Sequence, residues 1–126
     1  MEKLIGKTGE AKIIVEKEHT AKCVKSGDLE VFATPMMIAL MEEAACNLIQ
    51  KGLKAGETTV GVQIDVKHIA PTPIGNEARA KATLLEADGK KLTFEVEASD
   101  GKGVIGKGRH KRMVVDQERF LKNAIK

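Results

Sequence analysis

The chain has 126 residues and a mass of 13.6 kDa, which suits one domain with a buried core and is too little for two. We therefore take residues 1–126 as a single domain. Hydrophobic residues make up 42% of the chain and charged residues 31%, a balance that argues against disorder. The net charge is only +3, and Trp and Tyr are absent, so neither a nucleic-acid surface nor a base-stacking platform is expected.

Targeting signals and cysteine usage point to the cytoplasm. Residues 1–6 lack the apolar run of a signal peptide, and no segment approaches the roughly 18 apolar residues of a membrane span. Cys23 and Cys46 have neither CxxC spacing nor a histidine placed to complete a zinc set, so no structural zinc is expected. We predict a cytoplasmic protein with reduced thiols and no membrane partner.

The first predicted strand, residues 11–15, precedes the most distinctive segment, a helix within residues 34–52. Thr34 is a good N-cap, Pro35 suits the first helical position, and Gly52 is a good stop. The polar side chains between residues 35 and 49 are those of Glu42, Glu43 and Asn47. A helix that is apolar nearly all round is buried nearly all round, so the rest of the chain must wrap it.

Four strand-like segments follow the helix. Residues 59–70 alternate in polarity, with one face formed by Val60, Val62, Ile64, Val66, His68 and Ala70. Residues 78–84 and 92–98 alternate in the same way. The pairs Asp88-Gly89 and Asp100-Gly101 indicate hairpins between these runs.

The last run, residues 104–115, is strand-like but interrupted by Gly106 and Gly108, which indicates a bend or a close approach of another backbone. Residues 116–123 are expected to form a short closing helix. One apolar helix followed by a long curved antiparallel sheet is the arrangement of the hotdog fold. We therefore predict an α+β hotdog fold.

Two carboxylates stand in the middle of the apolar helix. A buried carboxylate without a partner costs several kcal/mol, so Glu42 and Glu43 each need a partner or a solvated edge. At ~100° per residue the two side chains point about 100° apart, so a shared role is not expected. A salt bridge at the helix flank and a catalytic role both remain open.

His68 lies on the predicted core side of its strand. A lone histidine on an apolar face is commonly a satisfied core residue, but here carboxylates are available on the facing helix. A sheltered carboxylate–imidazole pair is a common general base near neutral pH. His19, in a polar stretch, is expected at the surface.

Two further features have a structural and a functional explanation. Thr34 can simply cap its helix, or its hydroxyl can join the free N–H groups of the helix N-terminus in binding an oxyanion. The basic cluster at residues 109–112, which contains His110 and Arg112, is either a solvated face or an anion site for a phosphate or carboxylate.

Four blocks of the sequence have a distinctive order and spacing. They are Val31-Phe32-Ala33-Thr34, Met37-x-x-Leu40-Met41-Glu42-x-Ala44, Val66-x-His68-x-Ala70-x-Thr72-Pro73-x-Gly75 and Ile105-Gly106-x-Gly108-x-His110-x-Arg112. Together they resemble the fluoroacetyl-CoA thioesterase-like branch of the hotdog superfamily, over about residues 8–122. The order of the Thr, Glu and His blocks makes the resemblance more specific than one to hotdog folds in general.

The resemblance implies a role for five residues. Thr34, Glu42 and His68 match the family's catalytic threonine, glutamate and histidine. Gly61 matches a glycine whose backbone helps to position the thioester, and Arg112 matches an arginine at the active site. The resemblance also implies a homodimer with the site at its interface, and hydrolysis of acyl-CoA without a metal or other cofactor, CoA being part of the substrate.

The chain departs from the family's namesake around the substrate pocket. Residues 25–30 are short and lack an aromatic side chain, where the namesake has a longer lid with an aromatic. Glu43 replaces a bulky aromatic residue. Fluoroacetyl discrimination is associated with that lid, so the resemblance implies the chemistry without implying the fluorinated substrate.

We therefore predict an acyl-CoA thioesterase that acts on a short or small acyl group. Glu42 would attack the carbonyl or activate a water, His68 would move protons, and Thr34 with N–H groups near Gly61 would polarise the carbonyl. Arg112 would steer an acyl carboxylate or the CoA phosphates. Dimers could pair into tetramers.

Two other functions are weighed against this prediction. A non-catalytic acyl-CoA-binding hotdog protein, a sensor or carrier, would leave Thr34, Glu42 and His68 without a shared purpose. A hotdog hydratase would call for an Asp and a His about five residues apart at the start of the helix, and neither occurs in residues 31–52.

Overall fold

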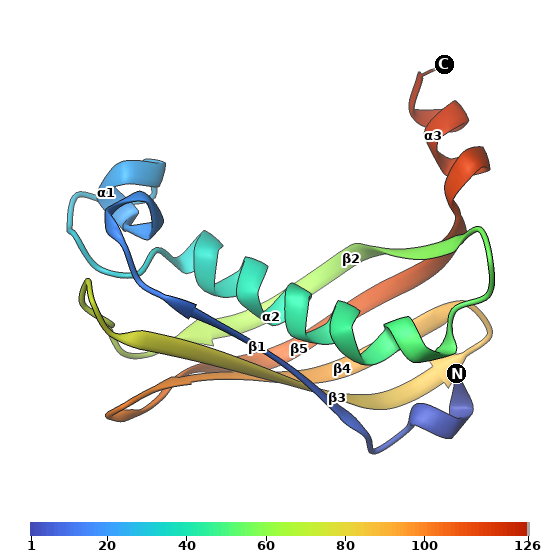
Figure 1. The fold of residues 1–126 in the computed structure, drawn as a ribbon, viewed down its shortest axis with the longest axis horizontal. Helices are drawn as coiled ribbons and strands as arrows, with labels where there is room; N and C mark the ends of the chain where they lie inside the picture. Colours follow the sequence, from blue (N-terminus) through green and yellow to red (C-terminus); the bar gives the residue numbers. More distant parts are fainter. Residues whose placement is uncertain (126) are drawn as a thin grey trace.

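The computed structural model describes residues 1–125, which form one antiparallel sheet with a helix lying across it (Figure 1). The strands are β1 (Thr8–Ile14), β2 (Glu57–His68), β3 (Glu77–Asp88), β4 (Lys91–Asp100) and β5 (Gly103–Asp116), in the spatial order β1-β3-β4-β5-β2. The α-helices are α1 (Ala21–Val24), α2 (Thr34–Ile49) and α3 (Gln117–Ile125), and short 3-10 helices cover Glu2–Leu4, Lys17–His19 and Gln50–Gly52. This is the predicted α+β hotdog arrangement.

The two predicted hairpins are confirmed. Asp88 pairs with Lys91 and Asp100 with Gly103, so each turn has two central residues. Gly89 has a φ of 61°, a left-handed conformation that glycine adopts without strain and that tight hairpins require. The inward faces of β3 and β4 are buried as predicted, through Ala78, Ala80, Ala82, Leu84, Leu92, Phe94, Val96 and Ala98.

Helix α2 lies on the concave face of the sheet and packs chiefly on β1 and β3. Its buried residues are Met37, Leu40, Met41, Ala44, Ala45, Leu48 and Ile49. Pro35, Ala39, Glu43 and Asn47 form an exposed stripe along the other side. The prediction of burial nearly all round was therefore wrong for a single chain, because a five-stranded sheet curves around one side of the helix and leaves the other open.

The start of α2 also differs from the prediction. The N-cap is Ala33, so Thr34 is the first helical residue and Pro35 the second. The Thr34 side chain makes no capping hydrogen bond. Its hydroxyl is instead engaged with His68, which removes it from the helix terminus.

Strand β2 is the free edge of the sheet next to β5, and a bulge divides it. Gly61 pairs with Arg112 and Gln63 with Lys111, which leaves Val62 as an extra residue. Beyond the bulge, Ile64 pairs with the buried His110, so Ile64, Val66 and His68 lie on the helix side as predicted. Before the bulge the alternation is reversed, so that odd-numbered residues lie on the helix side and even-numbered residues on the outer face.

This reversal corrects one part of the predicted alternation. Val60 pairs with Met113, between the buried Arg112 and Val114, so Val60 lies on the outer face. Thr59 and Gly61 take the inner positions instead. A bulge inserts one residue into one strand, and the side-chain period of two then reverses its phase.

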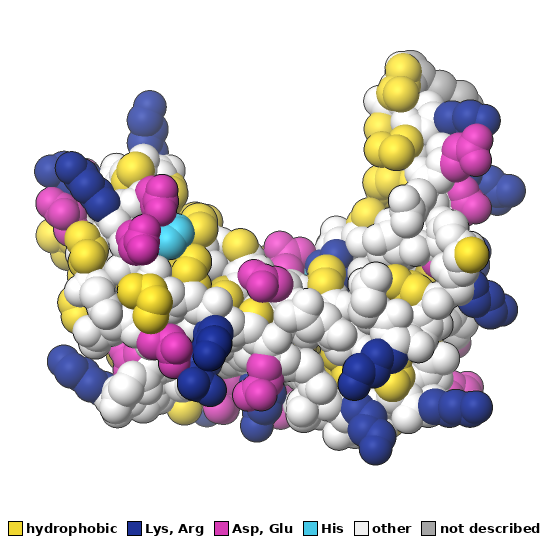
Figure 2. Space-filling model, viewed as in Figure 1, with side chains coloured by type: hydrophobic (Ala, Val, Ile, Leu, Met, Phe, Trp, Pro, Cys, Tyr) yellow, Lys and Arg dark blue, Asp and Glu magenta, His cyan; other side chains and the backbone are white. Residues whose placement is uncertain are grey.

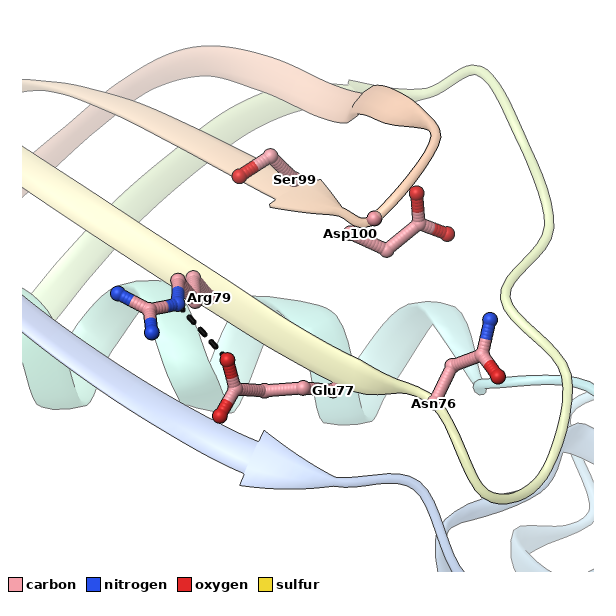
Figure 3. A pocket seen from close by; sticks show the side chains of 6 residues that line it. Asn76, Glu77, Arg79, Ser99 and Asp100 are labelled. Carbon is pink, nitrogen blue, oxygen red and sulfur yellow. Dashed lines mark hydrogen bonds and ion pairs between the residues drawn. The ribbon is translucent and has the colours of Figure 1, made fainter.

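The outer face of the sheet is polar. A hollow of about 340 Å³ lies at the ends of β3 and β4, and Figure 3 shows Asn76 and Ser99 among the side chains that line it. Arg79 Nε donates a hydrogen bond to Glu77 Oε1 there at 2.8 Å. None of the predicted site residues lines this hollow. Among residues 1–125, no helix is both long enough and apolar enough to cross a membrane.

Candidate active site

Thr34 and His68 meet at one end of the sheet. Thr34 opens α2 and His68 closes β2, and Thr34 Oγ1 lies 2.8 Å from His68 Nδ1, so the two share a hydrogen bond. The preceding segment is fixed by Phe32, whose side chain is buried and whose N–H donates to the Thr72 carbonyl. The pair lines a hollow of about 300 Å³ together with residues of α1 and of the segment 69–71.

His68 is held in the state that can accept a proton. Burial lowers its pKa below the ordinary value of 6.5, and a backbone hydrogen bond with Ala70 offsets part of that effect. Its Nε2 is buried and has no hydrogen-bond partner among the described residues. A neutral imidazole that touches a hydroxyl and keeps one nitrogen free is suited to proton transfer.

Glu42 belongs to a second cluster, farther along α2. Its Oε2 accepts a hydrogen bond from Arg112 Nη1 at 3.0 Å and lies 3.7 Å from His110 Nε2. The Glu42 side chain is half-buried, whereas both partners are buried. Glu43 is exposed, so the two adjacent carboxylates do differ in environment.

Arg112 is held almost entirely by its own chain. Its Nε donates to Thr59 Oγ1 at 2.9 Å, and its Nη2 donates to the Thr59 carbonyl at 3.0 Å. Its Nη1 lies 3.0 Å from Glu42 Oε2 and 3.2 Å from His110 Nε2. The residue is 6% exposed. In this chain the guanidinium therefore orients Glu42, and its N–H groups are largely occupied.

His110 completes this cluster, and its position beside Glu42 was not predicted from the sequence. Its Nδ1 lies 2.8 Å from the Gln63 carbonyl, which can only accept, so Nδ1 carries the proton and Nε2 is free to accept from Arg112 Nη1. Burial is the main cause that lowers its pKa, and the Gln63 carbonyl opposes it. The ring stacks on Phe94.

The signal for His110 was its place in the strand alternation. Residues 110, 112 and 114 share one face of β5, and all three are buried. Arg109 and Lys111 are exposed on the other face. The basic cluster is therefore divided between the two faces of β5. His110 and Arg112 are buried beside Glu42, whereas Arg109 and Lys111 are solvated.

Gly61 gives the Glu42 carboxylate its space. A Cβ at position 61 would meet Glu42 Oε2, and would lie 3.4 Å from both Arg112 Nη1 and His110 Cε1. Any larger residue would push the carboxylate away from its partners. The inward position of Gly61 is a direct result of the bulge at Val62.

The structure brings Glu42, Gly61 and Arg112 together, and separately Thr34 and His68, but keeps the two groups apart within one chain. Thr34 and Glu42 are eight residues apart on α2, or about 12 Å along its axis. Gly61 and His68 lie at opposite parts of β2, roughly 20 Å apart along the strand. Residues 1–125 contain no group of three His, Cys, Asp or Glu side chains arranged to hold a metal ion.

Comparison with known proteins agrees with this architecture. The family model for the fluoroacetyl-CoA-specific thioesterase FlK matches residues 15–118. The fluoroacetyl-CoA thioesterase of Streptantibioticus cattleyicolor is 41% identical over 91 residues, which make up 72% of this chain and 66% of that relative, just under two thirds of its length.

Solved structures extend the match to nearly the whole chain. A structure of the fluoroacetyl-CoA thioesterase FlK has a TM-score of 0.91 at 32% identity and covers 95% of this chain and 93% of that one. A hypothetical protein of Thermus thermophilus, described as a thioesterase superfamily member, has a TM-score of 0.88 at 25% identity and covers 95% and 89% of the two chains. With its curved five-stranded sheet and central helix, this chain belongs to the fluoroacetyl-CoA-specific thioesterase family of hotdog-fold thioester hydrolases.

Proposed function

We propose that this chain is an acyl-CoA thioesterase that hydrolyses a short or small acyl-CoA to a carboxylic acid and free CoA, with Thr34, Glu42 and His68 as its catalytic residues. The observation that carries the proposal is the hydrogen bond between Thr34 and the neutral His68 at the mouth of a hollow. Membership of the thioesterase family supports the reaction type.

The reaction divides into steps that these residues can perform. Thr34 and the N–H groups near Gly61 orient and polarise the thioester carbonyl. Glu42 attacks the carbonyl carbon or removes a proton from the water that attacks it. The C–S bond then breaks, and His68 relays to the departing thiolate a proton that comes from the hydrolytic water, either through Glu42 in the water route or when water cleaves the Glu42 acyl anhydride. No metal or other cofactor is needed for these steps.

The working unit is a homodimer whose sites lie at the interface. Within one chain Glu42 is distant from the Thr34–His68 pair, and β2 is an edge strand whose residues 61–65 are exposed. If two copies pair their β2 edges antiparallel about a two-fold axis between residues 64 and 65, Gly61 of one copy faces His68 of the other. Each site then combines Thr34 and His68 of one protomer with Glu42 and Gly61 of the second.

Arg112 has a different role from the one the sequence indicated. Its four hydrogen bonds within the chain leave little capacity to bind a substrate carboxylate or a CoA phosphate. We assign Arg112 to holding the Glu42 carboxylate in the site. The enzyme is proposed to work in the cytoplasm.

The first test is release of free thiol from a panel of acyl-CoAs, from acetyl to long-chain and phenylacetyl, by the purified protein. We expect turnover of at least one member, and a loss of ~10²-fold or more in kcat for His68→Ala and for Glu42→Ala. Circular dichroism should show both variants folded. Wild-type rates in both folded variants would contradict the site assignment.

Mixing the two inactive variants tests the shared site. Glu42→Ala and His68→Ala homodimers each lack one half of every site, but a heterodimer has one site with both halves intact. Denaturing and refolding an equal mixture should therefore restore about one quarter of wild-type activity, because half of the dimers are mixed and each has one of two sites. No recovery from a mixture that forms dimers would place both halves in one protomer.

A non-catalytic acyl-CoA sensor remains the second candidate, and the same panel separates it from the enzyme. A sensor would bind acyl-CoA, detected by calorimetry, without releasing thiol from any member. Its weakness is the engaged Thr34–His68 pair, which binding alone does not require.

A further inference from the structure

Helix α3 has an apolar face that the rest of residues 1–125 leaves largely uncovered. On a helical wheel Phe120, Leu121, Ala124 and Ile125 lie on one side, and Glu118, Arg119 and Lys122 lie on the other. Phe120, Leu121 and Ile125 are 43%, 61% and 82% exposed. Of the three phenylalanines, Phe32 and Phe94 are buried in the core. A helix of this pattern normally packs its apolar face against a partner.

A second apolar patch lies at the far end of β2. The segment 17–30, here called the α1 lobe, ends in a loop where Leu29 is 68% exposed. Ile69, which lines the same hollow as two residues of the lobe, is 57% exposed. Ala21 and Ser26 of this lobe line the hollow that holds Thr34 and His68. The lobe therefore stands beside the end of β2.

Helix α3 stands beside the start of the same strand. The Gln117 N–H donates to the Gly56 carbonyl, immediately before β2 begins. The α1 lobe and α3 thus rise at the two ends of β2 (Figure 1), and the space-filling view shows the surface hollowed between them (Figure 2). Figure 2 shows apolar side chains on the side of α3 that faces this hollow.

Antiparallel pairing of two β2 edges places these two patches together. The start of β2 in one copy then lies beside the end of β2 in the other, so α3 reaches the α1 lobe of the second copy. Within one chain the two patches stand at opposite ends of a 12-residue strand and do not meet. The exposed Ile64, on the helix side of the β2 edge, continues the same interface.

We propose that α3 packs in trans, with the face formed by Phe120, Leu121, Ala124 and Ile125 against the α1 lobe of a second copy, where it covers the hollow that contains Thr34 and His68. The inference rests on the homodimer of the proposed function. Phe120 thereby supplies an aromatic wall to a pocket whose own loop, residues 25–30, has no aromatic side chain. The acyl group is enclosed by both protomers.

The native Cys23 offers a direct test, because it lies exposed on α1. In a Cys46→Ala background, Ala124→Cys places a second thiol on the apolar face of α3, and Arg119→Cys places it on the opposite face as a matched control. A short bis-maleimide should link Ala124→Cys into covalent dimers in at least tenfold higher yield than Arg119→Cys. The product should disappear when Cys23→Ser is added.

A second variant measures what the contact contributes. Leu121→Asp removes the apolar contact at a largely exposed position, so the fold should be retained, and Leu121→Met is its conservative control. By sedimentation, Leu121→Asp should raise the dimer dissociation constant at least tenfold, and Leu121→Met should not. The KM for acyl-CoA should rise more than kcat falls.

Three outcomes would overturn the proposal: equal crosslinking at both positions, crosslinking at neither, or an unchanged dissociation constant in Leu121→Asp. The thioesterase assignment would survive each of them if the wild-type dimer hydrolyses acyl-CoA. A wild-type chain that hydrolyses acyl-CoA but sediments as a monomer would overturn both the dimer and the α3 contact. The thioesterase assignment would still stand.

Discussion

Burial holds both His68 and His110 in the neutral form, yet their hydrogen bonds suit them to different tasks. His68 shares its Nδ1 with a hydroxyl and keeps Nε2 free, so it can gain a proton during a reaction. His110 has both nitrogens committed, one to the Gln63 carbonyl and one to Arg112. At the scale of single residues, the contacts of His68 suit it to the proton transfer proposed for it, and those of His110 suit it to holding neighbouring groups in place.

The lowered pKa values predict how activity and stability depend on pH. Both histidines have a folded-state pKa below 6.5, so between that lower value and 6.5 the unfolded chain binds more protons. The free energy of unfolding should therefore fall as the pH drops through this window and level off below the folded pKa. Guanidinium titrations from pH 8 to pH 5 measure it, and His110→Gln should flatten the curve if the assignment holds.

Activity should fall over the same range for a separate reason. Protonation of His68 removes the group that accepts a proton, so kcat/KM should decline at pH values below the lowered pKa of His68. The midpoint should thus lie below 6.5. A midpoint above 6.5 would contradict a neutral, buried His68 as the titrating group.

Gly61→Ala should damage activity more than stability. The new Cβ meets Glu42 Oε2, which is the end of a flexible side chain that can move away, but the carboxylate then loses its position beside Arg112. We expect a fall in kcat of at least tenfold and a change of no more than about 1 kcal/mol in the free energy of unfolding. Gly101→Ala is the control, because a Cβ there meets nothing within 4 Å. Equal activity in the two variants would remove Gly61 from the site.

At the scale of elements, α2 packs against β5 at Gly106, which has no side chain. A Cβ at Gly106 would lie 2.7 Å from Met37 Cε and 2.9 Å from the Lys67 carbonyl oxygen. Gly106, predicted to mark a bend or a close backbone approach, does lie close to the Lys67 backbone, and it also lets the buried Met37 side chain of α2 rest on the strand.

Gly106→Ala should therefore destabilise the fold. Overpacking a well-filled core costs about 1–3 kcal/mol, and one of the two contacts here is with backbone, which cannot swing aside. Chemical denaturation should show that loss, whereas Gly101→Ala in the adjacent turn should be close to neutral. A neutral Gly106→Ala would mean that α2 can shift away from β5 at little cost.

The elements themselves were largely predictable from the sequence. Asp-Gly pairs fixed both hairpins, and alternation placed the buried faces of β3 and β4, because those signals are local. The bulge at Val62 was missed because valine continues an apolar alternation without interruption. Its phase shift becomes visible only in the pairing with β5, which is a property of two strands rather than of one.

At the scale of the whole molecule, the residues of the proposed site were named from the sequence, but their separation within one chain was not predicted. The resemblance to the family named Thr34, Glu42 and His68, and the chain folds so that the first and last touch while the second lies elsewhere. Distances between helix and strand positions depend on how the sheet curves, and sequence spacing does not contain them. The hydrogen bonds of Arg112 could not be predicted from the sequence for the same reason.

The bulge at Val62 also sets what kinds of change β2 can accept. Val62 is 56% exposed and adds a residue to β2 without one on β5, so replacing it alters little. Deleting it would put the remaining residues back into simple alternation and turn Thr59 and Gly61 outward, away from Arg112 and Glu42. Substitutions at position 62 should therefore be tolerated, whereas a deletion or an insertion in this part of β2 should not.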